Sequence, residues 1–175
     1  LPIQNVMKRF PDQIIPAIHN FIDDIMENKG PSGLFVAALL LYSIAQIGMT
    51  DYIEQYNDYC TTFISSRSKN IKAIGLRCAY SGKAPSYFLN SLPHILGMCL
   101  EEDPVCADAC IFLNVLFDDF TEENFWLFAS FFKNCYRHFK GHVFTRLIEI
   151  FVRTPIEHVP AIYDFLMSLI DFDTS

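Results

Sequence analysis

The chain repeats itself, and the period of the repeat constrains its fold more than any single residue does. Five stretches fall into one register when they are aligned on five anchor residues: Pro16, Asp58, Pro93, Trp126 and Pro160. These anchors are 42, 35, 33 and 34 residues apart. The residues two and five positions after each anchor are all apolar: Ile18, Cys60, Ile95, Phe128 and Ile162, then Phe21, Phe63, Met98, Phe131 and Phe165. A period of this length is typical of helix pairs stacked in a row.

A second register runs between the anchors of the first. Its own anchors are 37, 34 and 38 residues apart: Leu34, Ile71, Val105 and Val143. Four and then seven positions later stand two further sets: Ala38, Gly75, Ala109 and Leu147, then Leu41, Cys78, Phe112 and Ile150. Three residues of the first set are small, and a small residue lets two helix backbones approach closely. We therefore predict that each unit contains two tightly packed helices.

Apolar residues recur at intervals of three and four throughout, while Gly, Pro, Asn and Asp mark the breaks between helices. The predicted first helices are 13–28, 51–65, 86–101, 121–139 and 156–170, and the predicted second helices are 32–47, 69–80, 104–118 and 142–153. Thr121 is expected to cap the helix that follows it, with acidic residues in the first turn. Asp51 and Glu54 suggest a similar capping box.

Short motifs within these helices resemble one known kind of repeat. The first helices contain three apolar-Pro pairs: Ile15-Pro16, Leu92-Pro93 and Val159-Pro160. The turns and second helices contribute Asp103-Pro104-Val105 with Ala109, and Ile71-Lys72. On these residues the chain resembles a HEAT or armadillo-type α-solenoid, and HEAT repeats more closely because each unit has two helices. Departures from the pattern are Cys106 and Phe144, where a basic residue is usual, and Asp58 and Trp126, where the proline is usual.

The resemblance implies an all-α fold, a right-handed α-solenoid of about four to five stacked antiparallel helix pairs. We expect residues 1–175 to form a single HEAT-like repeat domain. Neither end has the polar surface of a capping repeat, so we expect a fragment of a longer solenoid. Such motifs specify a fold and carry no activity of their own.

Composition narrows the choice of partner and compartment. The formal net charge is −7 and the pI is about 5.1, so no basic field attracts nucleic-acid phosphates. The longest uncharged apolar run, 34–49, is shorter than the roughly 20 residues of a bilayer span, so no membrane insertion is expected. The six cysteines lie within helical patterns, unlike those of a secreted disulfide framework. We therefore expect an intracellular protein, cytoplasmic or nuclear.

Two groups of cysteine and histidine residues have spacings that metal sites use: Cys99, Cys106 and Cys110 with His94, and His138 with His142. Packing explains the cysteines without a metal, because cysteine is among the most frequently buried residue types. Gly141 is expected to end a helix between the two histidines. The sequence has neither a nucleophile elbow nor a phosphate-binding glycine loop. We expect no catalytic residue, no metal ligand and no cofactor, and hence no enzymatic activity.

Second helices usually line the concave side of such a stack, so their exposed positions are candidates for contacts with a partner. Along these positions the chain changes from apolar in the first unit to mixed charge in the third and fourth. An exposed Trp126 would anchor a partner well, although packing between units explains it too. The predicted contact residues are Leu40, Ile44, Arg77, Asp108, Asn114, Trp126, Arg146, Glu149 and Arg153. In the alternative interpretation, upstream sequence covers Leu40 and Ile44 as part of a core.

These features predict a non-enzymatic scaffold or adaptor that binds a helix or an extended peptide of another protein. Segments of nuclear-transport receptors and of vesicle-trafficking adaptors are more specific alternatives. An RNA-binding helical repeat is an alternative of another class, but it requires basic and stacking residues at fixed second-helix positions, and here those positions vary. The last alternative is a small helical metal enzyme.

Overall fold

The computed structural model describes residues 2–28, 30–154 and 167, and every regular element in this part of the chain is helical. The all-α prediction is confirmed there. The α-helices are α1 (Pro2–Arg9), α2 (Pro11–Asn28), α3 (Pro31–Gln46), α4 (Tyr56–Ile64), α5 (Lys69–Ser81), α6 (Leu92–Met98), α7 (Val105–Leu116), α8 (Glu122–Cys135) and α9 (Gly141–Val152). The 3₁₀ turns are η1 (Thr50–Tyr52), η2 (Pro85–Ser91), η3 (Phe117–Asp119) and η4 (Tyr136–His138). Apart from residue 167, the predicted helix 156–170 lies outside the described residues.

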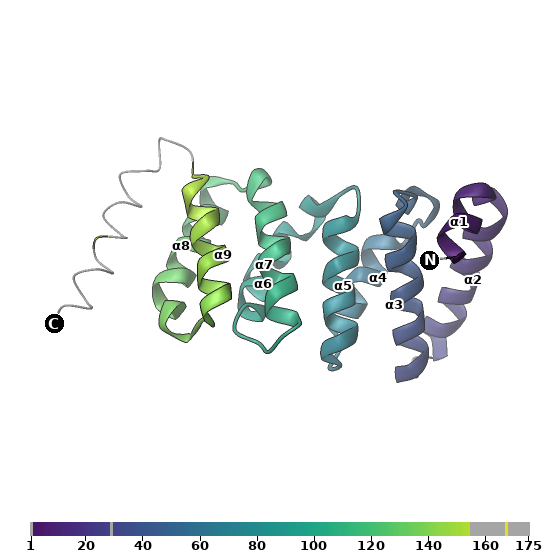
Figure 1. The fold of residues 1–175 in the computed structure, drawn as a ribbon, viewed down its shortest axis with the longest axis horizontal. Coiled ribbons are helices and arrows are strands. Elements are labelled where there is room, and N and C mark those ends of the chain that lie inside the picture. The colour runs from purple at the N-terminus through teal and green to yellow at the C-terminus, as the bar shows by residue number, and fades with distance from the viewer. Residues whose placement is uncertain (1, 29, 155–166, 168–175) are drawn as a thin grey trace.

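The helices stand side by side in one extended row (Figure 1). Helix α3 packs against α5, α5 against α7, and α7 against α9. Helices α3, α5 and α7 each also pack against the helix before them in the chain, α2, α4 and α6 respectively. In Figure 1, α4 and α6 lie farther from the viewer than α3, α5 and α7, so that these helices form two layers.

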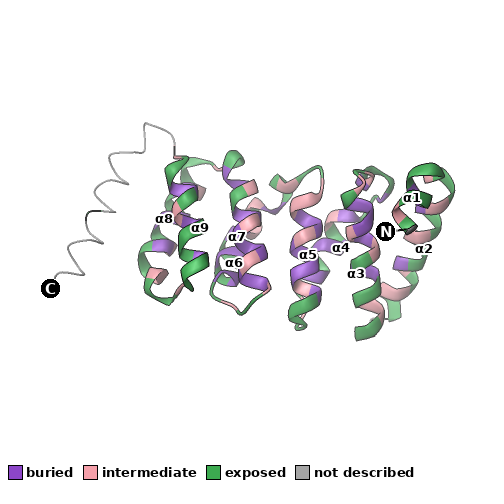
Figure 2. Ribbon diagram, in the orientation of Figure 1, coloured by how far each residue is buried: buried purple, intermediate pink, exposed green. Residues whose placement is uncertain are grey.

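The core lies between these two layers and follows both registers. Figure 2 shows buried residues on the helices in the middle of the row and more exposed residues on α2 and α9. All eight second-helix residues that the register predicts to face neighbouring helices are buried: Ala38, Gly75, Ala109, Leu147, Leu41, Cys78, Phe112 and Ile150. In the first helices, the position six residues after each described anchor is also buried. Its residues are at most 5% exposed: Ile22, Ile64, Cys99 and Phe132. Removing these apolar side chains from water stabilises the row.

Some predicted details are wrong. The segment 51–55 is not part of an α-helix: η1 ends at Tyr52 and α4 begins at Tyr56. No capping box forms there, because the Asp51 carboxylate pairs with Lys83 instead. Residues 85–91 form the 3₁₀ turn η2, and α6 begins only at Leu92, with Pro93 in its first turn.

Two further differences concern the N-terminal end of the row, α1 and α2. The short helix α1 was not predicted because it precedes the first anchor, yet its Met7 is fully buried in the core. Phe21 is 46% exposed, although the register predicts a core position. The equivalent Phe63 of α4 and Met98 of α6 are buried, whereas Phe131 of α8 is partly buried.

Thr121 caps α8 as predicted. Its hydroxyl oxygen accepts a hydrogen bond from the backbone N–H of Asn124 at 3.3 Å, and the Asn124 side-chain oxygen accepts one from the backbone N–H of Thr121 at 3.1 Å. The reciprocal pair satisfies donors that the first turn of a helix otherwise leaves without partners. It fixes the point where the chain enters α8.

Gly75 provides a test of close helix packing. A Cβ atom at this position would lie 2.8 Å from the backbone nitrogen of Ile64 and 2.8 Å from the Cβ of Phe63, both in α4. Replacing Gly75 with alanine is expected to lower the free energy of unfolding by about 1–2 kcal/mol, because the clash outweighs the gain of about 1 kcal/mol in helix propensity. Urea denaturation measures the difference.

The matched control for this substitution is Gly97→Ala in α6. Apart from its chain neighbours and the nearby backbone of α6 itself, no atom in the described part of the chain lies within 4 Å of a Cβ built at Gly97. The same substitution should therefore leave stability unchanged or raise it by up to about 1 kcal/mol. Equal effects at the two glycines would contradict the close approach of α4 and α5.

Candidate interaction surface

Eight of the nine predicted contact residues lie in second helices or, in the case of Arg153, directly after α9, and Trp126 lies in α8. We use the name second-helix face for the six polar residues among the eight: Arg77, Asp108, Asn114, Arg146, Glu149 and Arg153. Hydrogen bonds connect Arg77 to Asp108 and Arg153 to Asn114. Asn114, Arg146 and Glu149 line one cavity.

The Arg77 guanidinium and the Asp108 carboxylate join α5 to α7. The Nε atom of Arg77 lies 3.1 and 3.0 Å from the two carboxylate oxygens, and the Tyr80 hydroxyl donates a longer hydrogen bond of 3.4 Å. Asp108 is only 4% exposed, whereas the Arg77 side chain is 37% exposed. The hydrogen bond to Asp108 raises the pKa of Arg77, which therefore stays charged. Asp108 thus positions Arg77, and the prediction that Asp108 itself contacts a partner is wrong because its carboxylate is buried.

Arg153, which follows α9, reaches back to α7. Its Nη1 atom donates to the backbone carbonyl of Asn114 at 3.1 Å and to the side-chain oxygen of Asn114 at 2.6 Å. Its Nη2 atom pairs with Asp118, and its guanidinium carbon lies 5.6 Å from the centre of the Phe117 ring, within the range of cation–π attraction. These contacts hold a long side chain in one place.

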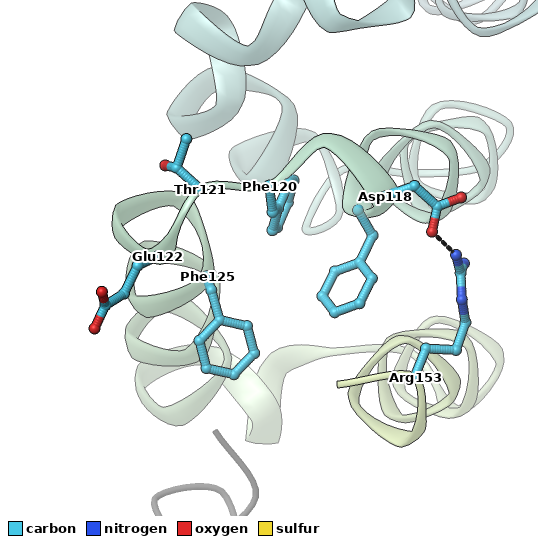
Figure 3. Close-up of a pocket in the computed structure, with 7 residues that line it drawn as sticks. Asp118, Phe120, Thr121, Glu122, Phe125 and Arg153 are labelled. Carbon is cyan, nitrogen blue, oxygen red and sulfur yellow. Dashed lines mark hydrogen bonds and ion pairs between the residues drawn. The ribbon is translucent and has the colours of Figure 1, made fainter. Parts of the chain in front are cut away.

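A cavity of about 210 Å³ lies beside Arg153, between η3, the start of α8 and the end of α9 (Figure 3). Figure 3 places the Asp118–Arg153 pair on one side of it and Phe125 with Glu122 on the other. The lining residues are Phe117, Asp118, Phe120, Thr121, Glu122, Phe125 and Arg153. The volume is below the roughly 300–1,000 Å³ of small-molecule sites.

Trp126 lies next to this cavity. Its ring packs edge-on against Phe125, with the ring centres 5.4 Å apart, and its Nε1 atom donates to Glu122 at 3.5 Å. Both of these neighbours line the cavity. Trp126 is 40% exposed, so a partner that enters the cavity can also reach the indole. Its role as an anchor stays a prediction.

A smaller cavity of about 130 Å³ lies between α7 and α9. It is lined by Cys110, Ile111, Asn114, Arg146 and Glu149. Arg146 and Glu149 are exposed, one turn apart on α9. Asn114, which lines this cavity, also accepts a hydrogen bond from Arg153, so it lies between the cavity and that guanidinium.

The apolar end of the predicted surface needs a correction. Ile44 is fully buried in the core, so it cannot contact a partner. Leu40 is partly buried and packs against the core, and its contact with a partner stays a prediction. The exposed apolar residues of α3 are Phe35, Val36 and Leu39. The sequence prediction missed these residues because the positions that it selected, Leu40 and Ile44, lie on another side of α3.

A cluster of three potential metal ligands was also missed. It lies where the turn before α7 meets the first turn of α9. The Oδ1 atom of Asp103 is 3.0 Å from Sγ of Cys106 and 3.3 Å from Nε2 of His142, and Sγ and Nε2 are 3.9 Å apart. Lys140 lies 3.5 Å from the other carboxylate oxygen, Oδ2. The second-helix register places two of these residues next to successive anchors: Cys106 follows Val105, and His142 precedes Val143. This pattern could have indicated the cluster.

The geometry of this cluster does not suit nucleophilic catalysis. One ring nitrogen, Nε2 of His142, faces both the carboxylate and the thiol, whereas a catalytic triad uses opposite ring nitrogens for the two partners. Burial and the neighbouring Asp103 raise the pKa of Cys106 to about 12. A protonated thiol is a poor nucleophile. That the protein is not an enzyme stays a prediction.

No protein-family model matches the chain, and no match was found among curated proteins or solved structures. Within the described residues, no α-helix combines the length and the apolar character that crossing a bilayer requires.

Proposed function

We propose that the chain is a non-enzymatic interaction scaffold, built as a right-handed HEAT-like stack of helix pairs, that binds a helix or an extended peptide of another protein. One observation supports the proposal most: Arg153, held by Asn114 and Asp118, borders a cavity of side-chain size, and Arg146 and Glu149 border a second one. Arg77, which Asp108 holds, adds a positioned charge on the same layer of helices. Charges that are already positioned beside such cavities lower the cost of ordering an interface.

The charges on the second-helix face indicate the chemistry of the partner. The face carries three arginines, Arg77, Arg146 and Arg153, against two carboxylates, Asp108 and Glu149, although the whole chain has a net charge of −7. Guanidinium groups form strong paired hydrogen bonds with carboxylates. We therefore propose an acidic segment as the partner, with one aromatic or aliphatic side chain that enters the cavity in Figure 3.

The cysteines support a reducing compartment. All six are unpaired thiols, and five of them are buried. Thiols of this kind persist in the cytoplasm and the nucleus, where disulfides are rare. We propose one of these two compartments as the place of action.

Affinity capture from a cell extract, followed by mass spectrometry and a direct binding assay with the acidic protein retained, tests the proposal. Arg146→Glu reverses one exposed charge on the second-helix face, and it is expected to weaken binding by about tenfold or more. Lys133→Glu is the matched control, because it makes the same charge change at an exposed position of α8. If the two variants bind the partner equally well, the second-helix face is not the binding surface.

A further inference from the structure

We propose that Asp103, Cys106 and His142 bind one Zn²⁺ ion, a role separate from the interaction surface proposed above. The three side chains supply an oxygen, a sulfur and a nitrogen atom that lie within 4.8 Å of one another. Asp103 comes from the turn before α7, Cys106 from the first turn of α7 and His142 from the first turn of α9. The fold therefore brings together ligands that are 36 residues apart in the chain.

The distances between the three atoms fit a tetrahedral zinc site. Zinc lies about 2.3 Å from cysteine sulfur, about 2.0–2.1 Å from histidine nitrogen and about 2.0–2.2 Å from carboxylate oxygen. Tetrahedral angles then separate the ligand atoms by about 3.3–3.6 Å. The observed separations of 3.0, 3.3 and 3.9 Å lie on both sides of these values. Shifts of a few tenths of an ångström are enough to admit the ion.

The mixture of ligand types selects the metal. Thiolate and imidazole ligands suit zinc, whereas magnesium and calcium prefer oxygen ligands alone. Zn²⁺ would replace the thiol proton of Cys106, which passes to solvent. Lys140 contacts Oδ2 of Asp103, and this leaves Oδ1, the oxygen that faces Cys106 and His142, for the ion. The Lys140–Asp103 pair is about half exposed, so it competes weakly with a divalent cation.

Solvent has access to the site. Cys106 is buried, but the side chains of Asp103 and His142 are 52% and 46% exposed. An ion can therefore enter without unfolding the helices, and a water molecule can take the fourth position, as in zinc sites with three protein ligands. The ion would fasten the turn before α7 to the start of α9.

The test uses the full chain with its thiols reduced by a phosphine. After metal removal, the protein is titrated with ZnCl2 in competition with a coloured chelator, and with CoCl2 in a spectrophotometer. One equivalent of Zn²⁺ is expected to bind with a Kd below about 1 μM. Cobalt should give a thiolate charge-transfer band that is absent in Cys106→Ala. MgCl2 should not compete. His142→Ala, at an exposed position, should bind zinc at least about tenfold more weakly while circular dichroism shows an unchanged helix content.

Cys135→Ala and His138→Ala are the matched controls, because they remove a thiol and an imidazole outside the cluster. Both are expected to bind zinc as the unsubstituted chain does. Uptake of much less than one equivalent, or equal weakening by the control and the cluster variants, would overturn the proposal. In that case Asp103, Cys106 and His142 form only a hydrogen-bonded group.

Discussion

Replacing Phe132 with alanine is expected to lower the free energy of unfolding by about 3–5 kcal/mol. Phe132 is fully buried in α8. Its ring centre lies 5.0 Å from that of Phe151, 5.6 Å from that of Phe144 and 5.7 Å from that of Phe139. Alanine would leave a cavity among these rings, and the atoms around it would lose dispersion contacts. Urea denaturation followed by circular dichroism measures the loss.

Phe21→Ala is the matched control for this prediction. The same atoms are removed, but Phe21 is 46% exposed on α2. Its replacement should cost about 1–2 kcal/mol, clearly less than that of Phe132, because nearly half of Phe21 is already in water. A loss as large as that of Phe132→Ala would mean that Phe21 is a core residue, as its register position indicates.

The place where Phe132→Ala acts tests the modular stack itself. The described helices contact mainly their neighbours in the row, so a local defect should stay local. Amide hydrogen exchange is expected to accelerate most in α8 and α9 and least in α3. Equal acceleration in all helices would show that the row unfolds as one unit, and it would argue against the proposed stack of helix pairs.

Burial within the described helices was the predictable part of the fold, because the same sequence register occurs several times along the chain. Burial at positions such as Ala38, Gly75 and Ala109 follows from periodicity alone. The turns were less predictable because distant contacts shape them. Asp51 pairs with Lys83, which is 32 residues away, so it does not cap the helix that its sequence suggests.

The candidate sites were predictable only as positions on a helix face. The second-helix register placed Arg77 and Asp108 on the second-helix face. It did not reveal that the two side chains pair or that the Asp108 carboxylate is buried. The same register aligned Cys106 and His142 with adjacent anchors. Their contact depends on side-chain directions in two first turns, and a count of residues between anchors does not contain those directions.

The Arg77–Asp108 pair should respond asymmetrically to substitution. Arg77→Ala is expected to cost about 2–3 kcal/mol, because it leaves a buried carboxylate with the Tyr80 hydroxyl as its remaining described partner. Asp108→Asn is expected to cost about 1 kcal/mol, since the guanidinium that it leaves is 37% exposed and can be hydrated. Urea denaturation of the two variants measures the difference.

The double variant Arg77→Ala/Asp108→Asn separates the cost of an unpaired charge from the loss of packing. Removal of the buried charge should make the double variant more stable than Arg77→Ala alone, so the two substitutions should not be additive. Additive losses, or equal losses in the single variants, would mean that the pair behaves like an exposed surface ion pair. Asp108 would then not position Arg77, and partner binding through Arg77 should be insensitive to Asp108→Asn. If Asp108 does position the guanidinium, this substitution weakens partner binding even though a buried residue touches no partner.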